Sequence, residues 1–394
     1  MEFTDAAFSS QMRPITGSAI REIFHLLGRP GMISFAGGNP SLAALEPDVV
    51  AELAQSALKK HGASLIQYGP TEGFAPLRES VAQFVGSAGV KATPAQVLPT
   101  QGSQQAMDLI LRAMIEPGDV ILVENPTFLG VIQAMRIAGA RLVAVPTDGK
   151  GVIVEAAEEA MIWHRPKLMY VIPTFQNPTG ITLAAERRAP LAKLAAKHGV
   201  LLIEDDPYRD LRYAGDAIPA IKAFDEAGWV AYLTSFSKLI APGLRVGAAV
   251  ADETLIRKLT IAKQSADVHS PLLTQAIVDG YFRNGLLAPH IRRVLGGYRE
   301  QLNAMLEGFA GFPAGVTHTT PQGGLFVWAS LPAGADALAM LKAAVERGVA
   351  YVPGTHFHID GGHLNTLRLN FSNSPVADIR RGMAALAEVA GQFV

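Results

Sequence analysis

Short apolar runs, each followed by polar or turn residues, recur along the first two thirds of the chain. Runs this rich in Val, Ile and Leu are typical of strands buried on both faces of a sheet, and helix-length segments such as 183–198 follow several of them. The runs are 97–98, 120–123, 142–145, 168–172, 200–203, 230–233 and 246–250. This alternation predicts an α/β fold with a mainly parallel sheet. Residues 246–250 follow the preceding run without a helix-length spacer, so we expect that strand to run antiparallel.

The pattern changes after about residue 285. Residues 292–309 and 336–348 predict helices, and 323–328, 349–352 and 366–371 predict strands, which together indicate a smaller α+β domain. Because single cores stop growing beyond roughly 250 to 300 residues, a chain of 394 residues is expected to form two domains. We place the large domain at 46–285 and the small domain at 286–394, with 1–45 as an N-terminal arm that contributes to the small domain.

Composition narrows the class of protein. Apolar residues make up 49% and charged residues 18%, which predicts a large core and argues against disorder. The balance of 34 basic and 35 acidic residues offers no basic surface for nucleic acid or for an anionic membrane. No cysteine is present, which excludes disulfides and Cys-ligated metals. Without an uncharged apolar run of transmembrane length or a secretory leader, a cytoplasmic protein is expected.

Lys238 is the centre of the candidate chemistry. It ends the run Ser235-Phe236-Ser237-Lys238 and lies seven residues before Arg245. An aldehyde cofactor needs an unprotonated amine, and the pKa of lysine falls readily when the amine is desolvated or near another cation. Two hydroxyls and a guanidinium can bind a phosphate, with an attraction of ~4 kcal/mol for charges ~4 Å apart at an effective dielectric near 20. Taken alone, these residues could also be a surface lysine and an unrelated arginine.

Other polar residues follow the predicted strands. Asn177, Asp205 and Tyr208 lie beyond strand carboxyl ends, where open α/β sheets bind ligands. After residues 97–98, a turn with glycine opens a helix whose first amides, at Ser103 and Gln104, can point at an anion. An ordinary capped helix is the alternative for that segment.

Four motifs in order carry a family resemblance. They are Asn177-Pro178-Thr179-Gly180, Asp205-Asp206-Pro207-Tyr208, Ser235-Phe236-Ser237-Lys238 with Arg245, and Leu367-Arg368-Leu369. From about residue 33 to 371 the chain resembles the fold-type I pyridoxal 5′-phosphate (PLP) aminotransferases of class I. Segments 18–22 and 34–40 and the spacer 239–244 are similar to the branch with 2-aminoadipate and kynurenine aminotransferases. The resemblance implies a seven-stranded sheet in a large PLP-binding domain.

The resemblance also assigns cofactor roles. Lys238 is expected to form the Schiff base with PLP and to move the substrate proton, while Asp205 pairs with the pyridine nitrogen. Asn177 and Tyr208 are expected to hydrogen-bond the phenolic oxygen O3′. The remaining implied cofactor residues are Ser103, Gln104, Ser235, Ser237 and Arg245 at the phosphate, Phe128 stacked on the ring, and Tyr68 at the phosphate of a neighbouring subunit. That last role implies a homodimer with shared active sites.

Substrate residues follow from the same resemblance. Arg368 is expected to bind the α-carboxylate, with the backbone of Gly38 nearby. Arg21 could face a distal carboxylate, as in 2-oxoglutarate, glutamate or 2-aminoadipate, or could be an ordinary surface arginine. His356, His358 and His363 lie close in sequence, but their surroundings favour a polar loop, and no metal is expected.

The sequence therefore predicts a homodimeric PLP-dependent aminotransferase. It is expected to take nitrogen from an aromatic, branched, aliphatic or 2-aminoadipate-like amino acid and to pass it to a 2-oxo acid, 2-oxoglutarate first, by ping-pong chemistry. Other PLP carbanion enzymes, such as β-lyases and decarboxylases, share the same cradle. The ligand-sensing domain of a transcription regulator is the non-enzymatic alternative. Closure of the small domain over substrate is a further expectation.

Overall fold

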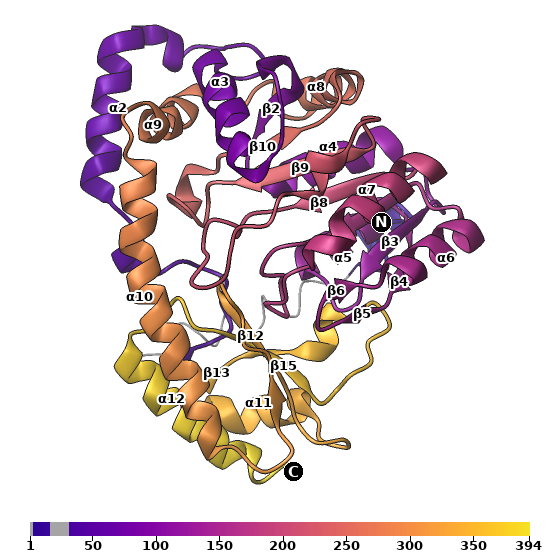
Figure 1. Ribbon diagram of the computed structural model, residues 1–394, viewed down its shortest axis with the longest axis vertical. Coiled ribbons are helices and arrows are strands. Elements are labelled where there is room, and N and C mark those ends of the chain that lie inside the picture. Colours follow the sequence, from indigo (N-terminus) through magenta and orange to yellow (C-terminus); the bar gives the residue numbers. More distant parts are fainter. Residues whose placement is uncertain (1–2, 16–30) are drawn as a thin grey trace.

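The computed structural model describes residues 3–15 and 31–394, and a seven-stranded sheet organises its larger part (Figure 1). The strand order is β2-β10-β9-β8-β7-β3-β4, with β8 in the centre. The strands are β2 Val97–Thr100, β3 Val120–Glu124, β4 Arg141–Val145, β7 Leu168–Val171, β8 Leu201–Asp205, β9 Val230–Ser235 and β10 Gly247–Val250. β10 is antiparallel to both neighbours, whereas the other paired strands are parallel. The predicted mainly parallel sheet is confirmed.

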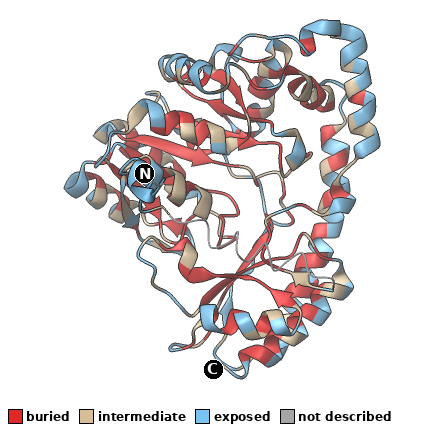
Figure 2. Cartoon of the chain, turned by 180° about the vertical axis from the view of Figure 1, so that it is seen from behind, coloured by how far each residue is buried: buried red, intermediate tan, exposed pale blue. Residues whose placement is uncertain are grey.

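Helices cover both faces of this sheet. Those on one face include α4 Ser103–Met114 and α5 Leu129–Ile137, and those on the other include α6 Val154–His164 and α7 Ala185–His198. Because successive strand residues point to opposite faces, Leu202 and Ile203 of β8 belong to different apolar cores. In Figure 2 the strands are buried between helices whose outer sides are exposed.

A second, four-stranded sheet lies toward the C-terminus. Its order is β11-β12-β15-β14, with bounds Thr317–His318, Phe326–Ser330, Thr366–Asn370 and Val352–Pro353 in that order. Helix α10 (Leu287–Gly308) runs along one side of the molecule past both sheets (Figure 1). The other helices are α2 Pro47–His61, α3 Ala75–Phe84, α8 Glu253–Asp267, α9 Leu272–Arg283, α11 Ala337–Glu346 and α12 Val376–Ala390. The short pairs are β5 Thr147–Asp148 with β6 Gly151–Val152, and β1 Ile33–Ser34 with β13 Val349–Ala350.

Two predicted strands differ in their bounds. The strand expected at 323–328 begins only at Phe326, whereas Gly323 forms an isolated antiparallel bridge with Arg212 and packs so closely that a Cβ there would lie 2.2 Å from the Phe175 ring. The strand expected at 349–352 is split at Tyr351, which is fully buried. The chain there changes from pairing with β1 to pairing with β15. Local packing, which apolar periodicity does not report, sets these ends.

Segment 35–39 is held against the C-terminal strands. β1 is parallel to β13, and the next residue, Phe35, donates its N–H to the carbonyl of Ala350 at 2.7 Å and accepts from the N–H of Asn370 at 2.8 Å. These bonds direct residues 36–38 toward the carboxyl end of the large sheet. No helix within residues 3–15 and 31–394 is long and apolar enough to span a bilayer.

Candidate active site

Polar side chains from four regions converge beyond the carboxyl end of β8. They come from the loop after β7, from the end of β8, from the loop after β9 and from β15, and segment 35–39 joins them. The predicted residues Asn177, Asp205, Tyr208, Lys238 and Arg368 are thus brought together. Parallel strands end at one edge of a sheet, which explains how residues far apart in sequence share this site.

Lys238 follows β9, and its amine is largely removed from solvent. Its Nζ donates a 2.8 Å hydrogen bond to the carbonyl of Gly38. Burial, and after it the positive charges of Arg368 and Arg245, lower the pKa of Lys238 to about 8. A substantial share of this amine is therefore neutral in mildly alkaline solution, and the neutral form is the nucleophile.

Asp205 ends β8, and its carboxyl group is buried beside β7. Tyr170 of β7 donates a 2.8 Å hydrogen bond to Oδ2 of Asp205. Burial raises the Asp205 pKa to about 7, although the hydrogen bonds from Tyr170 and Ser103 oppose that rise. Among the described residues, Oδ1 has no hydrogen-bond partner. Because an unsatisfied buried oxygen costs free energy, a ligand with an N–H group is favoured at this atom.

Arg368 reaches from β15 to the loop after β7. Its Nη1 donates to Oδ1 of Asn177 at 3.0 Å, and its Nη2 donates to the carbonyl of Ala36 at 2.6 Å. The guanidinium carbon lies 4.3 Å from the ring centroid of Phe326 and 5.0 Å from that of Phe357. Burial lowers its pKa to about 10, and Nε has no partner within the described chain. A buried guanidinium with a free N–H favours an anion.

Tyr208 is buried next to these groups. Its ring meets that of Phe326 edge to face, with centroids 5.9 Å apart. Burial raises the pKa of the Tyr208 hydroxyl well above its ordinary value, and the hydrogen bond with Asn177 only partly opposes this effect. The hydroxyl therefore stays protonated at neutral pH and can act as a donor.

Arg245 lies beside the loop that opens α4. Its Nη2 donates to the carbonyl of Gln101 at 2.9 Å, and a Cβ on Gly102 would lie only 3.0 Å from that nitrogen. Gly102 has φ of +78°, which glycine adopts without strain, and it leads directly into Ser103. The first turn of α4 thus begins next to a guanidinium, an arrangement that suits a phosphate.

Ser235 and Ser237 lie near the loop that opens α4, because the strands that carry Ser235 and that precede this loop are joined by β10. Ser235 pairs in register with Gly247 of β10, which pairs with Thr100 of β2. The two serine hydroxyl oxygens are 3.0 Å apart. On the other side of the α4 N-terminus, Gln104 donates through Nε2 to the carbonyl of Gly130 at 3.3 Å.

Phe128 borders the same group of loops. It is half-buried immediately before α5, and a Cβ on Gly130 would lie 2.8 Å from its ring. Since Gln104 bonds the backbone of Gly130, the Phe128 loop adjoins the start of α4. The residues predicted for phosphate and ring binding therefore lie on neighbouring loops.

The remaining predicted residues differ in their surroundings. Tyr68 is 80% exposed. Arg21 lies outside the described residues. The rings of His358 and His363 stack with centroids 4.0 Å apart. Within the described part of the chain, no cluster of three or more His, Cys, Asp or Glu side chains is arranged to hold a metal.

Two supporting residues were not predicted from sequence. Glu124, at the end of β3, accepts the N–H of Ile172 at 2.8 Å and lies 3.5 Å from Nε2 of Gln176. The same Nε2 donates to the carbonyl of Pro126 at 2.7 Å. Gln176 thus links the loop before Phe128 to the loop with Asn177. A carboxylate at the end of an apolar run was the available signal.

Comparisons with known proteins identify the family. Residues 30–386 match the family of class I and II aminotransferases. The chain is 42% identical, over 97% of its length and 93% of the relative, to aromatic-amino-acid aminotransferase 1 of Thermococcus litoralis. It is 40% identical, over 96% and 95%, to the 2-aminoadipate transaminase of Thermus thermophilus. A solved α-aminoadipate aminotransferase, LysN of Thermus thermophilus, complexed with N-(5′-phosphopyridoxyl)-L-leucine, superposes with a TM-score of 0.91 at 38% identity, covering 98% of both chains.

The chain therefore belongs to the class I and II aminotransferases and has the fold-type I architecture. It is a PLP-dependent amino-acid aminotransferase, as the motifs predicted. The residues present fit PLP. The unsatisfied Oδ1 of Asp205 suits a pyridine N–H, the amine of Lys238 suits an aldehyde, and Arg245 beside Gly102 suits a phosphate.

Glu124 gives a prediction for stability against pH. Burial raises its pKa from 4.5 to about 8. The folded protein thus keeps a proton that the unfolded chain loses near pH 4.5, so this contribution to stability is lost as the pH rises toward about 8. Relative to Glu124→Gln, the free energy of unfolding of the wild type should fall by roughly 1 to 4 kcal/mol between about pH 5 and pH 8, since one pKa unit is ~1.4 kcal/mol.

Denaturant titrations at both pH values measure this difference. Glu226→Gln, a change at an exposed glutamate, provides the control. Parallel pH dependence of the wild type and Glu124→Gln would show that Glu124 is ionised when folded.

Proposed function

We propose that this enzyme transfers nitrogen from aromatic, branched, aliphatic or 2-aminoadipate-like amino acids to a 2-oxo acid, with 2-oxoglutarate as the main acceptor. The names of the relatives from Thermococcus litoralis and Thermus thermophilus support the aromatic and 2-aminoadipate donors. The observation that carries the proposal is the buried Lys238 amine, which bonds Gly38 and lies within the field of Arg368. This proximity of the Lys238 amine to the Arg368 guanidinium supports a single site for an amino acid.

Lys238 has both a covalent and a proton-transfer role in this proposal. When bound, PLP supplies an aldehyde and an electron-withdrawing ring. The neutral Nζ of Lys238 would hold that aldehyde covalently. Once a substrate amine had freed it, the same Nζ would accept the proton of the substrate α-carbon and later release it. Its pKa of about 8 allows it both to accept and to release a proton near neutral pH.

Three residues set the electronic state of the ring. Oδ1 of Asp205 is free to accept the pyridine N–H, while Tyr170 holds Oδ2. Arg368 donates to Oδ1 of Asn177, and the Asn177 amide donates to Tyr208, so its second N–H would be the one that donates to O3′. The protonated hydroxyl of Tyr208 is the second donor toward O3′.

The phosphate and the substrate carboxylate are bound by separate arginines. The phosphate is bound by Arg245, by the hydroxyls of Ser235 and Ser237, and by the backbone amides of Ser103 and Gln104. Phe128 covers the ring. Arg368 binds the α-carboxylate through its unpartnered Nε, with Gly38 alongside. Phe326 and Phe357 exclude water from that ion pair and so strengthen it. A role for Arg21 toward a distal carboxylate remains a proposal from the sequence.

Domain division and location also stay proposals. We infer a large domain at 46–285 and a small domain at 286–394 joined by residues 1–45, because segment 35–39 and Arg368 approach the site from the side of the small sheet. This arrangement suits closure of the small domain over substrate. A cytoplasmic location rests on the sequence alone.

Replacing Lys238 tests the chemistry. Lys238→Ala should retain PLP through Arg245 but lose at least ~10³-fold in transfer to 2-oxoglutarate, since it lacks both nucleophile and base. Consumption of 2-oxoglutarate with a panel of donors is the measurement, and Lys258→Ala, at an exposed lysine of α8, is the control.

The wild type given an amino acid alone should stop after one turnover. Continuous product formation would indicate a lyase, and full transfer by Lys238→Ala would refute the assigned role.

A homodimer with shared sites is also proposed. Tyr68 is 80% and Ile66 is 72% exposed, and a groove of about 640 Å³ next to them is lined by Gly69, Ile261 and Val268. Large exposed apolar side chains around a groove indicate a protein contact. A second copy whose Tyr68 reaches the phosphate near Arg245 would cover this surface.

Mixed dimers test the sharing. Subunits with Lys238→Ala and subunits with Tyr68→Ala should both be weakly active alone. After mixing and exchange, random pairing leaves one intact site in each hybrid, so activity should recover to about a quarter of the wild-type value. Sedimentation should show a dimer throughout. A monomer, or activity equal to the mean of the parents, would contradict shared sites.

A further inference from the structure

Arg188 is a fully buried cation outside the catalytic cluster. It lies in the first turns of α7, on the face of the sheet opposite to α4, and has 0% exposure. Its neighbour Arg187, by contrast, pairs with Asp148 near the surface. Burying a guanidinium is costly unless its N–H groups are satisfied. The partners of Arg188 therefore reveal what it holds.

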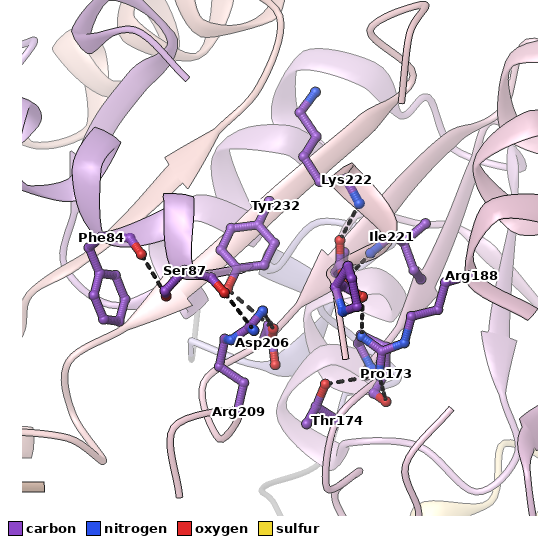
Figure 3. A network of polar contacts seen from close by, with 12 residues as sticks. Phe84, Ser87, Pro173, Thr174, Arg188, Asp206, Arg209, Ile221, Lys222 and Tyr232 are labelled. Atoms are coloured by element: carbon purple, nitrogen blue, oxygen red, sulfur yellow. Dashed lines mark hydrogen bonds and ion pairs between the residues drawn. The ribbon is translucent and has the colours of Figure 1, made fainter. Parts of the chain in front are cut away.

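Those partners lie at the two ends of the loop 173–183, which carries Asn177. Nη2 of Arg188 donates to the carbonyl of Pro173 at 2.9 Å and to Oγ1 of Thr174 at 3.2 Å, at the beginning of the loop. Nε and Nη2 each donate to the carbonyl of Leu183 at 3.2 Å, at its end. Figure 3 shows the guanidinium directed at Pro173 and Thr174.

The loop itself is closed by few backbone bonds. The N–H of Leu183 donates to Pro173 at 2.7 Å, and the N–H of Gln176 donates to Ile181 at 2.9 Å. Arg188 braces the first of these closures from the side, because its acceptors at Pro173 and Leu183 are the residues that close the loop. If Pro173 and Leu183, the two ends of the loop, were displaced, the Asn177 amide would move with them.

A second contact ties the same guanidinium to the strand of Asp205. Nη1 of Arg188 donates to the carbonyl of Pro219 at 2.9 Å. Glu204, which directly precedes Asp205, accepts the N–H groups of Ile221 and Lys222 at 2.8 Å each. The short segment 219–222 is therefore held by Arg188 on one side and by β8 on the other (Figure 3).

The charges are arranged to tolerate the buried cation. Glu204 and Asp206 both attract Arg188, and Asp206 also pairs with Arg209 at 3.6 Å and accepts from the hydroxyl of Tyr232 at 3.2 Å. Oδ2 of Asp206 is thus bound by Arg209 and Tyr232. An apolar side chain in place of Arg188 would take away the side-chain donor of the Leu183 and Pro219 carbonyls, while Pro173 would keep the N–H of Leu183.

We propose that Arg188 is a positioning residue that fixes Asn177 relative to Asp205. The inference rests on the proposed function, since Asn177 matters here as a donor to O3′ of the cofactor. A donor misplaced by a fraction of an ångström loses much of its effect on a bound group. Arg188 would therefore affect the cofactor without touching it.

The test is a double-mutant cycle on the PLP-loaded enzyme. Arg188→Lys keeps the charge but lacks the planar fork that reaches both ends of the loop. We measure the PLP dissociation constant and the pH midpoint of the visible absorbance of the bound cofactor. A donor to O3′ stabilises that oxygen's anion, so loss of the donor raises the midpoint. Asn177→Ala should raise it, and Arg188→Lys should raise it in the same direction with about 3- to 10-fold weaker PLP binding.

The double variant distinguishes positioning from general stability. In the Asn177→Ala background, Arg188→Lys should cause no further rise in the midpoint. Arg187→Lys, one position earlier on α7, should leave both quantities at the wild-type values. A lower melting temperature with an unchanged midpoint, or equal shifts in both backgrounds, would overturn the proposal.

If Arg188→Lys does not fold, Thr174→Val, which removes one acceptor of Arg188, takes its place in the same cycle. A rise in the absorbance midpoint only when Asn177 is present supports the proposal. Equal shifts with and without Asn177 overturn it. If Asn177→Ala leaves the midpoint unchanged, the proposed role of Asn177 fails and the positioning role fails with it. If only Asn177→Ala shifts the midpoint, the proposed function stands and the inference about Arg188 is wrong.

Discussion

Desolvation of ionisable groups beyond the end of β8 is the constraint on which the site depends. Burial lowers the pKa of Lys238 to about 8 and that of Arg368 to about 10, and it raises that of Asp205 to about 7. Each group is thus pushed toward its neutral form. A ligand that brings a carboxylate and a ring N–H supplies partners for the unpaired Nε of Arg368 and Oδ1 of Asp205. The same burial that is unfavourable without a ligand therefore favours binding of such groups.

Supporting side chains behind the site keep these groups in place. Tyr170 fixes one oxygen of Asp205 and leaves the other free. Gln176 joins the Asn177 loop to the loop of Phe128, and Arg188 joins it to the segment next to β8. Asp205 and Arg368 stand on strands, whereas Asn177 and Lys238 stand on loops whose supporting bonds include those of the buried side chains Gln176 and Arg188. Such support gives loops the precision of a rigid scaffold.

Much of this arrangement could be predicted from the sequence. Apolar runs marked the strands of the large sheet, and the missing spacer before residues 246–250 correctly predicted the antiparallel β10. The motifs around Asn177, Asp205 and Lys238 gather at one edge because the parallel strands β7, β8 and β9 end there, and Arg368 reaches them from β15 of the second sheet. The sequence did not reveal Arg188 or Glu124, since each reads as an ordinary polar residue until its burial is known. The late start of β12 accompanies the close packing of Gly323 against Phe175, which periodicity does not encode.

The central claim is that Lys238 carries the cofactor. The most direct test is to reduce the PLP-loaded enzyme with sodium borohydride, digest it and locate the phosphopyridoxyl group by mass spectrometry. We expect one labelled residue, Lys238, and loss of that label when an amino acid donor is added before reduction. A label on another lysine, with Lys238 unmodified, would show that Lys238 does not carry the cofactor.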